Sequence, residues 1–195
     1  MTVIGIAIFE GVEELDFVGP WEVLGMWTGQ WPEDGAKVFT MAQHEGVVEC
    51  AKGLRVIPDH TWKSAPPMDV LIYPGGRGTR TQVSDEEVLA WLNTQAERGT
   101  LMTSVCTGSL VYAAAGLLDG RPATTHWSTL DSLSELGKDI EIRPDDRFVD
   151  SGDVITASGV SAGIDMALHL VARLHSTERA RDVRRAIQYD PAPPV

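Results

Sequence analysis

Hydrophobic residues along the chain form two kinds of pattern, and the first is a short run in which nearly every position is apolar. Residues 3–9, 69–73 and 101–105 are such runs. Apolar runs of this length without alternation are typical of strands buried on both faces of a sheet. Similar reasoning predicts further short strands at residues 37–41, 54–57, 139–142, 147–149 and 154–156.

The second pattern has helical spacing. Residues 84–87 match a capping box, which predicts that Ser84 caps a helix, that Glu87 reaches back to it, and that Gly99 ends it. Pro20 is a residue type favoured in the first turn of a helix, so a helix is expected from there to residue 26 or 27. Further helices are predicted at residues 107–118, 129–136, 161–174 and 178–187.

Strands that alternate with helices predict an α/β fold with a mostly parallel sheet covered by helices on both faces. Ligands of such sheets bind beyond the carboxyl ends of the strands. The length of 195 residues and the lack of a linker or repeat predict a single domain spanning residues 1–195. The proline-rich tail at residues 191–194 is expected to be extended and peripheral.

Charge and cysteine content narrow the function classes. The formal net charge of −12 disfavours binding to nucleic acid and to anionic membranes. No apolar run is long enough to span a bilayer, and the N-terminus shows no signal-peptide pattern. The two cysteines, Cys50 and Cys106, do not make a disulfide framework, so we expect a cytoplasmic protein with reduced thiols.

The most specific local feature surrounds Cys106. A predicted strand runs into Cys106 and a predicted helix starts at once, which is the geometry of a nucleophile elbow, with Gly108 allowing close packing. The helix dipole would lower the pKa of this thiol, and free amides there would stabilise an anion. The alternative is an inert buried cysteine. Cys50, in a peripheral strand, is interpreted as a packing residue.

A reactive thiol needs a proton partner, and the candidates are Asp16 and the histidines. The apolar neighbours of Asp16 favour desolvation and a raised pKa, whereas its alternative role is to cap a helix. His126 is either part of the site or an ordinary polar residue at a strand–helix turn.

Two glycine-containing turns are the remaining candidates. Gly75 and Gly76 end a central strand and either expose amides as an oxyanion site or form a plain tight turn. Gly159 and Val160 also leave a strand for a helix, and the small residues there either line a pocket or serve helix–sheet packing. No Walker loop, dinucleotide fingerprint or metal-site spacing occurs in the sequence.

Taken together, these motifs resemble the ThiJ/PfpI superfamily, and within it the isocyanide hydratases. The resemblance covers nearly the whole chain, and its carriers are residues 15–20, 74–76, 103–110, 114–118, 123–127, 163–165 and 189–194. The cysteine elbow and the Thr-Thr-His-Trp segment, residues 124–127, are shared with amidase-like domains of AraC-type regulators. Proteases and glyoxalases of the superfamily typically carry His after the cysteine, where this chain has Thr107.

The resemblance implies a flavodoxin-like three-layer sandwich, a homodimer with its pocket near the dimer interface, and a small-molecule isocyanide substrate. It implies Cys106 as nucleophile, Asp16 as acid/base partner and Thr107 in the pocket, with no cofactor and no metal. Ser158 and Ser161 depart from the Gly and Thr expected in that motif. A ligand-sensing domain without turnover and a redox protein acting through Cys106 oxidation are the alternatives. The regulators carry a helix-turn-helix region after this domain, which the chain is too short to hold.

Overall fold

A seven-stranded sheet organises the computed structural model, which describes residues 1–192. All of its strand pairs are parallel except the pair at one edge, β10 with β11. The strands in their order across the sheet are β10 (Phe148–Asp150), β11 (Val154–Ala157), β7 (Leu101–Val105), β6 (Val70–Tyr73), β1 (Thr2–Ala7), β2 (Ala36–Ala42) and β5 (His60–Thr61). Two small two-stranded sheets pair β3 (Val48–Glu49) with β4 (Arg55–Val56) and β8 (Pro122–Ala123) with β9 (Glu141–Ile142).

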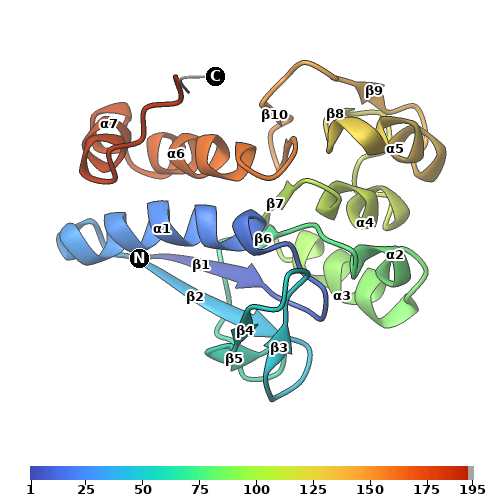
Figure 1. The fold of residues 1–195 in the computed structure, drawn as a ribbon, viewed down its shortest axis with the longest axis horizontal. Coiled ribbons are helices and arrows are strands. Elements are labelled where there is room, and N and C mark those ends of the chain that lie inside the picture. Colours follow the sequence, from blue (N-terminus) through green and yellow to red (C-terminus); the bar gives the residue numbers. More distant parts are fainter. Residues whose placement is uncertain (193–195) are drawn as a thin grey trace.

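Helices cover both faces of the large sheet (Figure 1). On one face, α1 packs against α6 and α7, and on the other α3 and α4 pack against β7. The helices are α1 (Glu14–Gln30), α2 (Thr79–Gln82), α3 (Glu86–Glu97), α4 (Gly108–Ala114), α5 (Leu130–Leu136), α6 (Ala162–Leu174) and α7 (Thr177–Ala186), with 3₁₀ turns η1 (Pro32–Asp34) and η2 (Trp127–Thr129). The predicted flavodoxin-like three-layer architecture is therefore confirmed.

The central strands follow from their composition. All four residues of β6 and all four of β11 are buried, as expected for strands covered on both faces. Met166, Leu170 and Val171 form the buried side of α6, at the spacing that puts them on one helix face. The apolar runs thus predict the strand positions well, because both faces of each central strand are filled by helix side chains.

Several predicted boundaries are wrong. Helix α1 begins at Glu14 rather than at Pro20, which lies inside the helix. Because Pro20 lacks an N–H, the helix loses one hydrogen bond there, and the burial of Asp16 and Phe17 in its first turns overrides that loss. The helix expected to reach residue 118 ends at Ala114, since Gly116, with φ of 77°, takes the left-handed conformation that ends helices.

The predicted capping box is also wrong in its detail. The cap of α3 is Asp85, whose Oδ1 accepts from the backbone N–H of Glu87 at 3.0 Å and of Val88 at 3.3 Å. Ser84 instead donates to the carbonyl of Thr81 at 3.2 Å, at the end of the unpredicted helix α2. Carboxylate and hydroxyl cap about equally well, so sequence alone does not choose between neighbours. The expected tail at residues 191–194 lies partly outside the described residues.

Candidate active site

Cys106 occupies the tight turn between β7 and α4. Its backbone φ is 55°, and its N–H lies 3.1 Å from the carbonyl oxygen of Ala157 and 3.0 Å from that of Ser158. Gly108 makes the turn possible, because a Cβ there would lie 2.2 Å from the carbonyl oxygen of Tyr73. The strand-to-helix turn predicted at Cys106 is confirmed, and it holds a thiol that is 6% exposed.

Asp16 brings a carboxyl group to this thiol from the first turn of α1. The side chain is fully buried, and it lies near enough to Cys106 for each group to affect the pKa of the other. Its Oδ2 accepts from the Gly75 N–H at 2.9 Å, whereas its Oδ1 is buried and has no hydrogen-bond partner within residues 1–192. Asp16 does not cap α1, whose cap position is Glu13 and has no side-chain hydrogen bond. The helix-cap interpretation of Asp16 is therefore wrong.

Burial sets the acidity of both groups. Burial away from water raises the pKa of Asp16 to about 7, as its apolar neighbours predict, although the hydrogen bond from the Gly75 N–H acts in the opposite direction. Burial and the Asp16 charge raise the pKa of Cys106 to about 12, although the N–H groups of Val160 and Thr107 act in the opposite direction. The lowered thiol pKa expected from the helix start is thus wrong. Above pH 7 the carboxyl group is therefore charged and the thiol keeps its proton, whereas below pH 7 both groups are protonated.

Thr107 and the two glycines form the adjoining wall. The Thr107 Oγ1 accepts from the Gly76 N–H at 2.9 Å and lies 3.1 Å from the Thr79 hydroxyl. A Cβ on Gly75 would lie 2.5 Å from the Thr107 nitrogen and 2.9 Å from the Asp16 Oδ2, so the segment approaches the site by backbone alone. Gly76 has φ of 125°, a conformation suited to glycine.

The turn after β11 contributes the opposite wall. Val160 has φ of 40°, which is rare for a β-branched residue, and its N–H faces the Cys106 sulfur. Gly159 lies against the His126 ring, since a Cβ there would be 2.6 Å from Cδ2. His126 caps η2, and its Nδ1 contacts the Ser128 hydroxyl at 2.8 Å. His126 therefore adjoins the turn, and no hydrogen bond joins it to Cys106.

Sequence reasoning missed two hydroxyls in contact with the elbow. Thr125 donates to the carbonyl of Cys106 at 2.9 Å, and Thr79 lies beside Thr107. Thr125 sits in the Thr-Thr-His-Trp segment already singled out, whereas nothing local marks Thr79. Two of the other candidate histidines are engaged elsewhere: His169 pairs with Asp150 at 2.7 Å, and His175 with Asp34 at 3.2 Å.

Among residues 1–192, no three His, Cys, Asp or Glu side chains are grouped so that they could hold a metal ion. Within the same residues, no helix is both long enough and apolar enough to cross a membrane.

Comparison with known proteins agrees with this architecture. The model of the DJ-1/PfpI family matches residues 2–173, and the chain belongs to that family. It is 39% identical over 191 residues to the isonitrile hydratase of Pseudomonas putida, a match covering 98% of this chain and 80% of that protein. A ThiJ/PfpI family protein from Pseudomonas syringae has a solved structure with a TM-score of 0.89 and 36% identity, covering 100% of this chain and 77% of that one.

A different kind of protein also matches. The transcriptional regulator GbdR of Pseudomonas aeruginosa is 34% identical over 143 residues, which cover 73% of this chain but 38% of the regulator. Family membership by itself therefore spans enzymes and regulators, and the choice between them depends on the site.

Proposed function

We propose that this protein is a cysteine-dependent isocyanide hydratase that converts an organic isocyanide and water into an N-substituted formamide. The observation that carries the proposal is the proximity of Cys106 to a fully buried Asp16, with a pKa of about 7, which accepts a hydrogen bond from the Gly75 N–H in the same site. A carboxyl group of that pKa exchanges protons readily near neutral pH. The 39% identity to an isonitrile hydratase supports the same reaction.

In the first half of the proposed reaction, the Cys106 sulfur attacks the terminal carbon of the isocyanide. The raised pKa of the thiol keeps preformed thiolate scarce, so the Asp16 carboxylate takes the thiol proton as the S–C bond forms. Asp16 then gives this proton to the same carbon, which leaves a thioimidate. The Val160 and Thr107 N–H groups stabilise the negative charge that develops on sulfur.

In the second half, water attacks the thioimidate carbon. Asp16 accepts a proton from the water and passes it to the nitrogen, which leaves a tetrahedral intermediate with a hydroxyl group on carbon. As the C–S bond breaks, the hydroxyl proton moves through Asp16 to sulfur, and the formamide is released. The sum is one isocyanide plus one water, with no net redox change, and Thr107 with Gly76 positions the substrate or the water.

We further propose that two copies of this single-domain protein form a homodimer along α1. Leu15, Val18 and Trp21 are exposed at one-turn spacing on the helix that carries Asp16, and each is 36–37% exposed. An apolar stripe of this kind beside the site suits contact with a second copy. Light scattering of the wild type and of Val18→Glu tests this: a dimer is expected for the wild type and a monomer for the variant.

The activity test uses an aryl isocyanide and follows formamide formation by absorbance. Cys106→Ala is expected to lower kcat/KM at least about a thousandfold, because no other group can form the thioimidate. Cys50→Ala is the matched control and keeps activity within about twofold. Full activity of Cys106→Ala would rule out the covalent route, and no turnover by a folded wild type would rule out the proposed reaction.

A further inference from the structure

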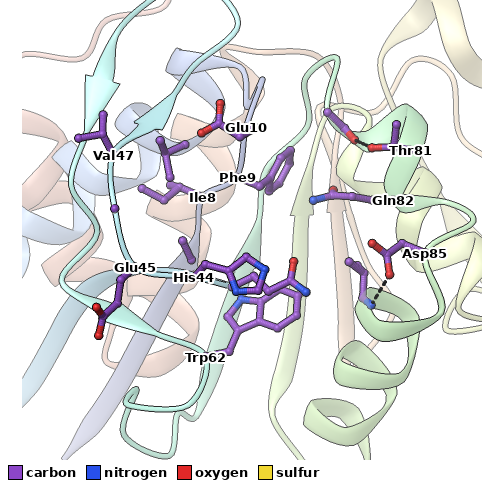
Figure 2. A pocket seen from close by; sticks show the side chains of 16 residues that line it. Ile8, Phe9, Glu10, His44, Glu45, Val47, Trp62, Thr81, Gln82 and Asp85 are labelled. Carbon is purple, nitrogen blue, oxygen red and sulfur yellow. Dashed lines mark hydrogen bonds between the residues drawn. The ribbon is translucent and has the colours of Figure 1, made fainter.

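A pocket of about 260 Å³ lies where β1 and β2 end, between them and helices α2 and α3. Figure 2 shows His44 and Trp62 reaching it from one side and Gln82 and Asp85 from the other. Neither Cys106 nor Asp16 lines it. The proposed reaction therefore leaves this pocket without a role.

Two aromatic walls of the pocket are fixed in place. The Trp62 ring stacks on Trp91 with centroids 4.1 Å apart and planes 5° apart. The Phe9 ring stacks on Tyr73 with centroids 5.4 Å apart. Side chains held in this way lose little conformational freedom when a ligand arrives, so the pocket is preorganised.

Two polar atoms of the lining residues lack a protein partner. The indole Nε1 of Trp62 and the amide Oε1 of Gln82 are buried, and within residues 1–192 neither makes a hydrogen bond. An unpaired buried polar atom costs roughly 1–3 kcal/mol, so native proteins seldom leave one unused. Both atoms have almost no accessible surface, so a ligand would pair with them only if the two side chains turned toward the pocket.

The negative charge of the lining residues favours a cationic ligand. Glu10, Glu45 and Asp85 bring three carboxylates, and among residues 1–192 no Lys or Arg lines the pocket. Asp85 is held by the α3 backbone and Glu10 accepts from the Glu49 N–H at 3.3 Å, so two of the three carboxylates are fixed. Carboxylates beside aromatic faces are the groups that bind an organic ammonium ion.

We propose that this pocket binds a small organic ammonium ion, a primary amine on a short aromatic or apolar group. The apolar part would lie between Phe9 and Trp62, and the ammonium group would face the Asp85 carboxylate beside Gln82. The exposed Glu10 and Glu45 add negative charge at other edges of the pocket. The proposal does not rest on the reaction at Cys106.

Calorimetric titration with phenethylammonium chloride tests the proposal, with phenylacetate as a probe of opposite charge and the same ring. The ammonium probe is expected to bind at one site per chain and at least about tenfold more tightly than phenylacetate. Glu45→Gln combined with Asp85→Asn should weaken its binding about tenfold, because two charges are lost while Asn still caps the helix. Glu97→Gln, an exposed carboxylate at the other end of α3, is the matched control.

Three results would overturn the proposal: equal binding of the two probes, unchanged binding by the double variant, or loss of binding in Cys106→Ser, which would place the probe at the thiol. If the double variant does not fold, Glu45→Gln alone decides. Glu45 is exposed and makes no structural hydrogen bond within residues 1–192, and its loss should weaken binding about threefold.

Discussion

The two cysteines of this chain are buried almost equally, yet their surroundings differ in kind. Cys106 is 6% exposed and Cys50 is 0% exposed, and burial raises the pKa of both, to about 12 and about 11. Cys50 follows β3, donates its N–H to Leu54 at 2.8 Å and lies near three glutamates that disfavour its thiolate. Cys106 has a protonatable carboxyl group and two backbone donors at its sulfur.

The comparison teaches that acid strength in the resting protein does not separate these thiols. The two thiols differ in whether a nearby group can accept the thiol proton and whether N–H groups can stabilise negative charge on sulfur. At Cys106, Asp16 is the proton acceptor, and the Val160 and Thr107 N–H groups stabilise the charge. The packing role predicted for Cys50 agrees with its place in the core beside α1.

The largest expected effect comes from removing the proton route. Asp16→Asn is expected to lower kcat/KM about a thousandfold, since the amide keeps the shape but cannot carry the proton. In the wild type, kcat/KM should rise as pH increases through about 7, because the carboxylate must be free to take the thiol proton. Activity measured from pH 5 to 9 checks both. An unchanged rate in Asp16→Asn would show that Asp16 is not what distinguishes Cys106 from Cys50.

Adding a side chain at Gly75, which lies against Asp16 and Thr107, should have the next largest effect on kcat/KM. The new Cβ in Gly75→Ala meets the Thr107 nitrogen and the Asp16 carboxylate, so the site must shift and kcat/KM is expected to fall about a hundredfold. Gly29→Ala, where a Cβ meets nothing within 4 Å, is the control and should stay within about twofold. If both variants keep activity, close packing at Gly75 is not needed for catalysis.

The burial of Asp16 should lower the free energy of unfolding when the carboxyl group is charged. Its pKa in the folded protein, about 7, lies above the ordinary value of 3.8. Its contribution to stability is therefore fully present below pH 3.8 and is lost as pH rises through 7, by up to about 4 kcal/mol. Asp16→Asn should raise the free energy of unfolding by about 2 kcal/mol at pH 8 and less at pH 5. Urea denaturation at both pH values measures this, and equal changes at the two would contradict it.

The smallest expected effect is a direct contrast of the two thiols. Iodoacetamide should label Cys106 about tenfold faster than Cys50 at pH 8, because only Cys106 has a base and amide donors at its sulfur. Mass spectrometry of the two cysteine peptides gives both rates in one sample. Asp16→Asn should reduce the difference, and equal labelling of the wild-type thiols would remove the basis of the comparison.

Sequence patterns predict the sheet and the elbow because both depend on local runs of residues. The same patterns misplace the start of α1 and the cap of α3, where burial of Asp16 and Phe17 or the choice between neighbouring polar residues decides. The direction of the Cys106 pKa depends on burial and on a charge ninety positions away, and no local pattern contains either. The place of Thr79 in the site could not be predicted for the same reason, because its contact is with Thr107, which is distant in the sequence.

The hydrogen bond from Gly75 to Asp16 joins residues 59 positions apart, and Cys106 and Val160 come later still. During synthesis on the ribosome, this arrangement therefore cannot exist until residue 160 has been added and the strands between have paired. Until then the thiol lacks the Val160 N–H, one of its two amide donors. The complete environment of the thiol is therefore a property of the folded chain and not of any local segment.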